Sequence, residues 1–141
     1  MPTPRNLDRL NANLPVFMKL FDGKVAEFDV EDGTATLTFT VGENLCHSGD
    51  VVQGGFVTAM LDAAMSHAVF GYDDTVANLS SLEISTRYLE ATRAGFLTAV
   101  GRIVRLSHKT AFLDGQLFNA DGHLLATTQS VAKIYRKAKE A

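Results

Sequence analysis

The chain has 141 residues, of which 46% are hydrophobic and 21% are charged, and its formal net charge is −3. This length predicts one globular domain with a sizeable core, and the slight negative charge argues against a general nucleic-acid-binding protein. Cys46 is the only cysteine, so an internal disulfide and a cysteine-rich metal site are both excluded. Such cysteine usage favours a reducing compartment, and we expect a cytoplasmic protein.

Residues 1–22 are predicted to form a short helix that acts as a lid. Leu7, Leu10 and Leu14 recur at helical intervals, and Pro15 interrupts the pattern. The segment has no continuous apolar stretch after a basic start, so it does not resemble a secretory signal.

Residues 23–136 are the predicted core, which begins with two paired strands. The alternating segments Lys24–Asp29 and Thr34–Val41 flank an Asp-Gly turn signal that ends at Gly33. A polar loop, Gly42–Asp50, then leads to the next element.

The run Val51–Tyr72 is predicted to contain a buried helix. It is almost entirely apolar, and Asp62 is its only formally charged residue. Two glycines, a glutamine and this mid-run aspartate argue against a membrane span, because a carboxylate at the membrane centre is costly. Burying a carboxylate on an apolar helix costs several kcal/mol unless it is hydrogen-bonded or neutralised. We therefore interpret Asp62 as a functional residue and favour a catalytic role.

Four alternating segments follow the helix, and the predicted strands are Val76–Leu89, Gly95–Leu106, Lys109–Asn119 and His123–Tyr135. In the first of them, alternation places Leu82, Ile84, Thr86 and Tyr88 on one face. One long apolar helix beside these strands predicts an α+β fold in which an antiparallel sheet curls around the helix. Residues 137–141 form a charged tail that we interpret as solvated.

Two features of this predicted fold indicate a partner subunit. The sheet has unpaired edges, which other chains can cover. The helix carries a partly polar stripe formed by Thr58, Asp62 and Ser66. We therefore expect a homo-oligomer.

Gln53, Gly54 and Gly55 lie where the helix is predicted to begin. Backbone N–H groups at that end have no intrahelical acceptor, and a ligand oxygen can approach closely where no Cβ intervenes. One helix could thus carry both hydrogen-bond donors and a base. Gly54 precedes Asp62 by eight residues, about 12 Å along the helix axis, so the two would have to be bridged by a bound substrate.

Three segments resemble a known family. HSGDVVQGGFVTAMLDAAM is similar to the motif of hotdog-fold acyl-CoA thioesterases of the phenylacetate-pathway (PaaI) type, in which a glycine pair precedes an apolar helix with an Asp or Glu. SLEISTRYLEATRAG looks like that family's long strand after the helix, and SHKTAFLDGQLFNADGHLLAT looks like its closing hairpin. The resemblance covers roughly residues 20–136. It implies a hotdog fold and hydrolysis of an acyl-CoA to free acid and coenzyme A, with no cofactor beyond the substrate itself.

The same resemblance implies roles for single residues. The Gly54 amide would polarise the thioester carbonyl, and Asp62 from the other subunit would attack that carbonyl or activate a water. Ser81 matches a strand hydroxyl that orients the water or the carboxylate, although Ser80 serves instead if the alignment shifts by one. His47 stands where the family usually has Asn or Gln, and at this catalytic position a neutral imidazole would donate one hydrogen bond to a water or a carbonyl.

Substrate binding is assigned by the same likeness. Gln53 stands where many members have His, and with Gly55 it would contact substrate. Lys109 matches a basic position beside the nucleotide. The neighbouring candidates for the coenzyme A phosphates are His108, Arg87 and Arg93, and the acyl pocket would be built across subunits from residues that include Phe56, Met60 and Phe70.

No metal is predicted, because His47, His67, His108 and His123 are scattered over different elements. His67 and Cys46 are expected to be packed residues rather than a ligand or a nucleophile. The main prediction is a cytoplasmic acyl-CoA thioesterase that works as a dimer or a dimer of dimers, without nucleic-acid or membrane partners. Two alternatives remain open: a non-catalytic acyl-CoA-binding hotdog module, and a hotdog hydratase, although the His-Asp dyad of that group is not evident.

Overall fold

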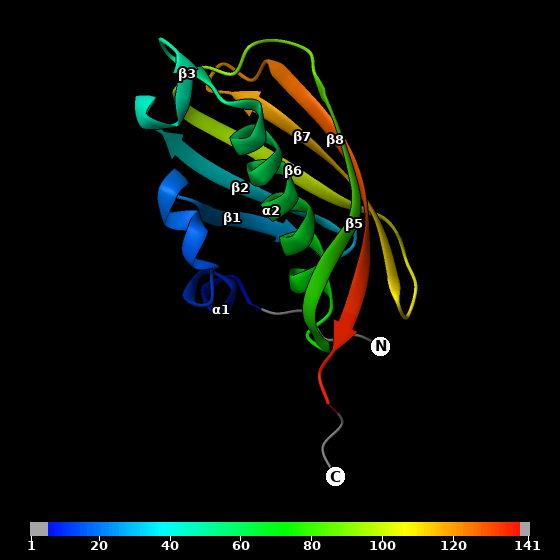
Figure 1. Ribbon diagram of the computed structural model, residues 1–141. Coiled ribbons are helices and arrows are strands. Elements are labelled where there is room, and N and C mark those ends of the chain that lie inside the picture. The colour runs from blue at the N-terminus through cyan, green and yellow to red at the C-terminus, as the bar shows by residue number, and fades with distance from the viewer. Residues whose placement is uncertain (1–5, 139–141) are drawn as a thin grey trace.

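The computed structural model describes residues 6–138, in which a curved antiparallel sheet wraps around one long helix (Figure 1). The central helix, α2, spans Gly54–Tyr72. The strands of the sheet are β1 (Lys24–Asp29), β2 (Thr34–Val41), β5 (Val76–Tyr88), β6 (Gly95–Leu106), β7 (Thr110–Asn119) and β8 (Leu124–Arg136). Their order across the sheet is β1-β2-β6-β7-β8-β5, and every neighbouring pair is antiparallel. The predicted α+β fold class is therefore confirmed.

The predicted N-terminal helix is divided into two short helices. The α-helix α1 spans Leu7–Ala12, and the 3-10 helix η1 spans Val16–Phe21. They meet near Pro15, whose ring and missing N–H prevent the first helix from continuing. The side chain of Asn11 fixes α1 to the sheet edge, because its amide group exchanges two 2.9 Å hydrogen bonds with the backbone of Val25.

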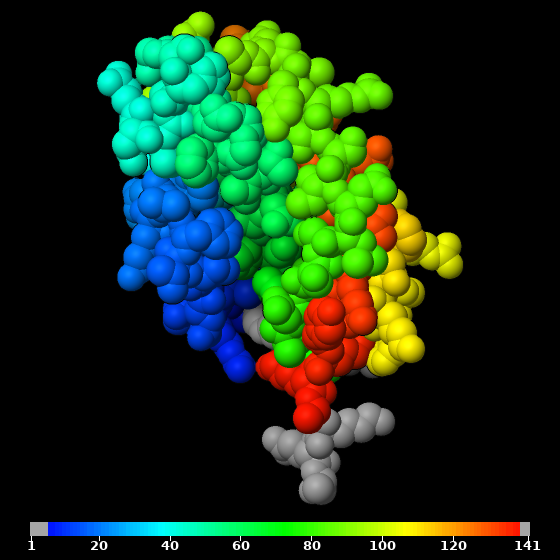
Figure 2. All heavy atoms as spheres, in the orientation of Figure 1, coloured from blue at the N-terminus to red at the C-terminus, as the bar shows by residue number. Residues whose placement is uncertain are grey.

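The segment predicted to be a loop before α2 contains a small hairpin that alternation did not reveal. Strand β3 (Cys46–Ser48) follows a 3-10 turn, η2 (Glu43–Leu45), and pairs with β4 (Val51–Val52). Because β4 runs directly into the helix, this hairpin lies at the N-terminal end of α2. From the side shown in Figure 2, α2 is visible as a strip between the N-terminal part of the chain, in blue and cyan, and β5.

Helix α2 is buried on most of its sides, as its apolar sequence predicted. It lies directly on β6, where a Cβ atom at Gly101 would overlap the backbone of Ala64 and Met65. Only glycine therefore permits this close approach of helix and strand. Within residues 6–138, no helix is both long enough and apolar enough to span a membrane.

Strand β5 forms one edge of the sheet and contains a bulge that changes which side chains face α2. Its pairing with β8 shifts between Ser81 and Glu83, so Leu82 has no partner residue. Leu82 is 65% exposed, whereas Ser81 contacts the helix. The prediction that Leu82 shares one face with Thr86 was wrong for this reason, because a bulge reverses the alternation on its two sides.

Candidate active site

Asp62 and Ser81 meet where α2 faces β5. The Ser81 hydroxyl donates a hydrogen bond of 3.1 Å to the Asp62 carboxylate, and the Asp62 side chain is partly buried. Burial raises the pKa of Asp62 above its ordinary value, and the hydrogen bond from Ser81 offsets only part of that rise. The serine that contacts the carboxylate is thus Ser81 and not Ser80.

No cation neutralises Asp62 among residues 6–138. The ion pairs in that part of the chain join Arg93 to Asp50, Arg102 to Asp114 and Arg136 to Asp73. A half-buried carboxylate with a raised pKa and a single hydroxyl partner is suited to accept a proton from water or to attack a carbonyl carbon.

Gly54 and Gly55 are the first two residues of α2, as predicted. In the first turn of a helix the backbone N–H groups have no intrahelical acceptor, so those of Gly54 and Gly55 are available to a ligand. The two glycines differ in their surroundings. A Cβ atom at Gly54 would lie 3.2 Å from the hydroxyl of Tyr88, whereas a Cβ atom at Gly55 would have no neighbour within 4 Å.

Three hydroxyl groups near the start of α2 were not assigned a role from the sequence. The Thr58 hydroxyl lies 2.9 Å from those of both Thr86 and Tyr88, and the Tyr88 hydroxyl donates to the Gly54 carbonyl oxygen at 2.8 Å. The signal was present, since Thr58 shares its helix stripe with Asp62, and Thr86 and Tyr88 alternate on one strand face. The sequence did not show that this stripe of α2 packs against this face of β5.

The structure places His47 and Gln53 at the same end of α2 but not against Asp62. His47 is exposed on β3, and its hydrogen-bond partner in the described part of the chain is the neighbouring Ser48, at 2.8 Å. Gln53 is the N-terminal capping residue of α2, and its side chain makes no capping hydrogen bond. Its backbone N–H donates to the Leu45 carbonyl at 3.0 Å, which ties the end of η2 to the start of the helix.

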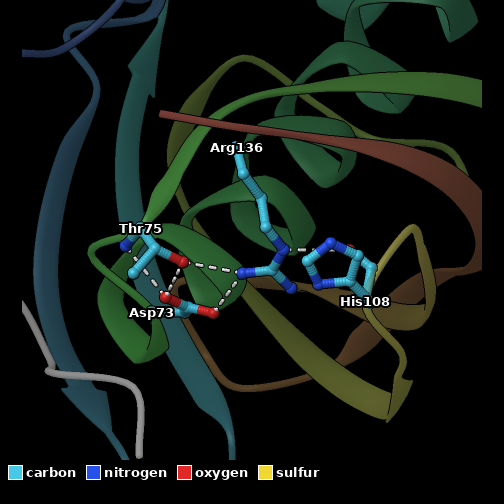
Figure 3. A network of polar contacts seen from close by, with 4 residues as sticks. All are labelled: Asp73, Thr75, His108 and Arg136. Carbon is cyan, nitrogen blue, oxygen red and sulfur yellow. Dashed lines mark hydrogen bonds and ion pairs between the residues drawn. The ribbon is translucent and has the colours of Figure 1, made fainter. Parts of the chain in front are cut away.

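His108 and Lys109 lie at the opposite end of the helix. They form the β6–β7 turn, and the His108 carbonyl accepts a 3.0 Å hydrogen bond from the Arg136 guanidinium. That guanidinium also binds Asp73, the residue after α2, at 2.9 Å (Figure 3). Helix α2 has 19 residues, so Lys109 and Gly54 are separated by nearly its whole length, about 27 Å. The two do not meet within one protomer.

Arg87 and Arg93 are also separate from Asp62. Arg87 neighbours Thr86 and therefore points to the other face of the sheet, where it lines a surface hollow with Ser85 and Asp114. Arg93 forms an exposed 2.6 Å ion pair with Asp50, which comes just before β4. Neither arginine shares a described contact with the carboxylate of Asp62.

Of the predicted acyl-pocket residues, Phe70 lines a surface cavity. Met60 is fully buried in the core, and Phe56 packs edge-on against Phe21. Phe70 borders a cavity of about 450 Å³ together with Arg9 and His67. Among the described residues, the three side chains thus have different surroundings.

His67 and Cys46 occupy the packed positions that were expected of them. His67 is buried, and its Nδ1 donates to the Ala63 carbonyl at 2.7 Å, since a carbonyl oxygen only accepts. Burial, Asp50 and Glu43 raise the pKa of the Cys46 thiol, which disfavours a nucleophilic thiolate.

Among residues 6–138 there is no group of three or more His, Cys, Asp or Glu residues that could hold a metal ion.

Comparison with known proteins identifies the family. The description "Thioesterase superfamily" belongs to the family model that matches residues 49–126, more than half of the chain. A protein of Sulfurisphaera tokodaii named "Putative esterase" is 28% identical over 130 residues, which cover 92% of this chain and 96% of that protein.

Two solved structures are similar in fold. The crystal structure of a phenylacetic acid degradation-related protein from Ralstonia eutropha has a TM-score of 0.82 at 23% identity, with 92% of this chain and 99% of that one covered. The E. coli PaaI protein, from the phenylacetic acid degradation operon, has a TM-score of 0.79 at 19% identity, with 92% and 91% covered. The expected hotdog fold of the PaaI type is thereby confirmed, and the chain belongs to the thioesterase superfamily.

Proposed function

We propose that this protein hydrolyses an acyl-CoA thioester to a free acid and coenzyme A. The observation that carries the proposal is the position of Asp62, a half-buried carboxylate with a raised pKa whose described partner is a hydroxyl and not a cation. Membership of the thioesterase superfamily supports this class of reaction. The proposed reaction needs water and a carboxylate and no cofactor, and its proposed place is the cytoplasm.

In the proposed mechanism Asp62 activates the thioester for cleavage by either of two routes. As a general base it takes a proton from water, and the resulting hydroxide attacks the thioester carbonyl carbon. As a nucleophile it forms a mixed anhydride with the acyl group, which water then hydrolyses. In both routes the carbon–sulfur bond breaks, and the coenzyme A thiolate leaves and takes up a proton.

The Gly54 N–H group is proposed to bind the carbonyl oxygen as it gains negative charge. The N-terminus of a long helix stabilises such charge, because its N–H groups have no intrahelical acceptor and the positive end of the helix dipole lies there. Asp62 lies two turns further along the same helix, about 12 Å away, too far to act on a carbonyl bound at its own Gly54. We therefore propose that each site combines Gly54 of one subunit with Asp62 of another.

The free edge of β5 supports a homo-oligomer. Strand β5 pairs with β8 on one side only, and unpaired edges are ready positions for association. Leu82 and Leu89, near this edge, are 65% and 54% exposed. A dimer through this region brings two copies of α2 near one another, and we propose a dimer or a dimer of dimers.

Coenzyme A binding is proposed to involve Lys109, with His108, Arg87 and Arg93 as further candidates. These side chains are exposed, as a phosphate site requires. Because Lys109 is at the far end of α2 from Gly54, the proposal requires that Lys109 serve a site whose Gly54 belongs to a different subunit. His47 and Gln53, beside the start of α2, are proposed to contact the substrate near its thioester.

A thiol-release assay tests the proposal. The protein is incubated with a panel of short, long and aromatic acyl-CoAs, and free coenzyme A thiol is followed for wild type, Asp62→Asn and His47→Asn. Hydrolysis that Asp62→Asn abolishes supports the enzyme. Saturable binding without thiol release from any member of the panel contradicts it and favours the acyl-CoA-binding module.

A further inference from the structure

The hydroxyl of Tyr88 lies against the first peptide of α2. It donates to the carbonyl oxygen of Gly54 at 2.8 Å, and its ring lies so close that a Cβ atom at Gly54 would be 3.3 Å from ring carbon Cζ. Tyr88 itself is 52% exposed, so this contact is not needed to bury its ring. The contact instead orients the peptide group that joins Gly54 to Gly55.

A chain of hydroxyl groups determines which way Tyr88 can donate. Thr128 donates its single hydrogen to the Ser85 carbonyl at 3.0 Å, so in its 3.2 Å contact with Thr86 it must accept. Thr86 has then used its hydrogen and must accept from Thr58 at 2.9 Å. Thr58 consequently has only lone pairs to offer Tyr88.

Tyr88 has a single hydroxyl hydrogen, and the Gly54 carbonyl oxygen, which can only accept, receives it at 2.8 Å. The Thr58 oxygen lies 2.9 Å from the same hydroxyl and competes for that hydrogen. The four hydroxyls link β8, β5 and α2 into one hydrogen-bonded line that ends at the first carbonyl of the helix.

The peptide whose carbonyl accepts this bond also carries the N–H group of Gly55. The carbonyl of Gly54 and the N–H of Gly55 belong to one planar unit, so a donor on the carbonyl oxygen both orients the N–H and makes it a stronger donor. Gly55 is exposed, and apart from its chain neighbours and the backbone of its own helix no atom lies within 4 Å of the position that a Cβ would take there. The peptide is thus held at its carbonyl oxygen, and its N–H lies in the first turn of α2, where no intrahelical acceptor is available.

We propose that Tyr88 is a positioning residue, which orients and polarises the Gly54–Gly55 peptide so that the Gly55 N–H becomes a second donor to the thioester carbonyl oxygen. This role rests on the proposed thioesterase function and adds to it. Strand β5 would then have two distinct roles. Ser81 contacts the carboxylate of Asp62, and Tyr88 positions the peptide that carries the second oxyanion donor.

The test compares wild type with Tyr88→Phe, which keeps the ring and removes only the hydroxyl. The acyl-CoA that wild type hydrolyses fastest is the substrate, and kcat and KM are measured across pH. We expect kcat to fall about 10-fold with KM unchanged, which is less than the roughly 10²- to 10³-fold cost of removing a direct oxyanion donor. The acid limb of the pH profile should stay in place, because the hydrogen-bond partner of Asp62 is Ser81.

Tyr135→Phe is the matched control. Tyr135 is 43% exposed on β8, where its ring contacts Lys133, and kcat should be unchanged. If Tyr88→Phe keeps wild-type kcat, or loses kcat only together with thermal stability, the positioning role is overturned while the thioesterase function stands. If wild type itself releases no thiol from any acyl-CoA, the proposed function fails and this role fails with it. Thr58→Val provides a second variant, and it should retain kcat because Tyr88 then donates to Gly54 alone.

Discussion

Ser81 on β5 donates a hydrogen bond across 3.1 Å to Asp62 on α2, and it reaches that position because the strand bulges at Leu82. The bond favours the ionised carboxylate, whereas burial opposes it and is the larger effect. The pKa of Asp62 is thus the balance of two effects, and each can be altered separately.

Ser81→Ala should move the acid limb of kcat/KM to higher pH. Loss of the hydrogen bond removes the influence that lowers the pKa of Asp62, so the carboxylate stays protonated further up the pH scale. Ser80→Ala is the matched control, since Ser80 is the exposed neighbour with its side chain on the other face of the strand. A limb that moves to lower pH, or that moves equally in both variants, contradicts this assignment.

Asp62→Asn should increase the thermal stability at pH 7. Because the pKa of Asp62 is raised in the folded protein, the folded state holds the proton more tightly than the unfolded chain, where an Asp has a pKa of about 3.9. Ionisation therefore costs folding free energy as pH rises from about 4 through the folded-state pKa. Asparagine avoids this cost while still offering an oxygen to Ser81.

Thermal unfolding at pH 7 and at pH 3.5 measures this effect. The advantage of Asp62→Asn should be present at pH 7 and should shrink at pH 3.5, where the wild-type carboxyl is largely neutral. Asp121→Asn, in the exposed turn before β8, should show no comparable gain. A melting temperature of Asp62→Asn below that of wild type at pH 7 would be inconsistent with a carboxylate that is costly to bury.

Gly101→Ala should destabilise the fold by about 1–3 kcal/mol or more, because the added Cβ overlaps the backbone of Ala64 and cannot be relieved by a side-chain rotation. Gly55→Ala, where the added Cβ has no neighbour within 4 Å, should be neutral or stabilising by roughly 0.4–1 kcal/mol. Urea unfolding of the two variants gives the comparison. Equal stabilities would mean that α2 does not pack on β6 as closely as described.

Leu82→Lys should reduce the oligomeric mass measured by light scattering. The substitution places a charge on an apolar side chain that is 65% exposed on the edge strand, and lysine is a residue that blunts such edges. Leu20→Lys, on η1, changes a side chain of similar exposure, 55%, away from that edge. A wild type that is monomeric at assay concentrations would contradict the shared site.

Most elements could be predicted from the sequence, because hydrophobic periodicity and the glycine and aspartate signals are local. The short β3–β4 hairpin could not, because its strands are too short for alternation to show. The bounds of β1, β2 and β6 agree with the prediction, and Pro15 divides the N-terminal helix where expected. The order of the strands depends on long-range pairing and could not be read in the same way.

The candidate site was also predictable only in part, because some of its features are local in sequence and others depend on long-range contacts. Asp62 could be identified because it interrupts an apolar run. The choice between Ser80 and Ser81 depends on a β-bulge, which the alternating pattern of the strand does not predict. The contact of Tyr88 with Gly54 joins residues 34 positions apart, and it exists only once α2 has docked on β5. Such tertiary contacts, rather than residue types, decide which side chains share a site.

The central claim is that Asp62 cleaves an acyl-CoA thioester, and the most direct measurement is the rate of coenzyme A thiol release by wild type and Asp62→Asn. The account predicts turnover of at least one acyl-CoA by wild type and a loss of about 10²- to 10⁴-fold in the variant, the usual contribution of a positioned general base. Wild-type rates that Asp62→Asn leaves intact would contradict it.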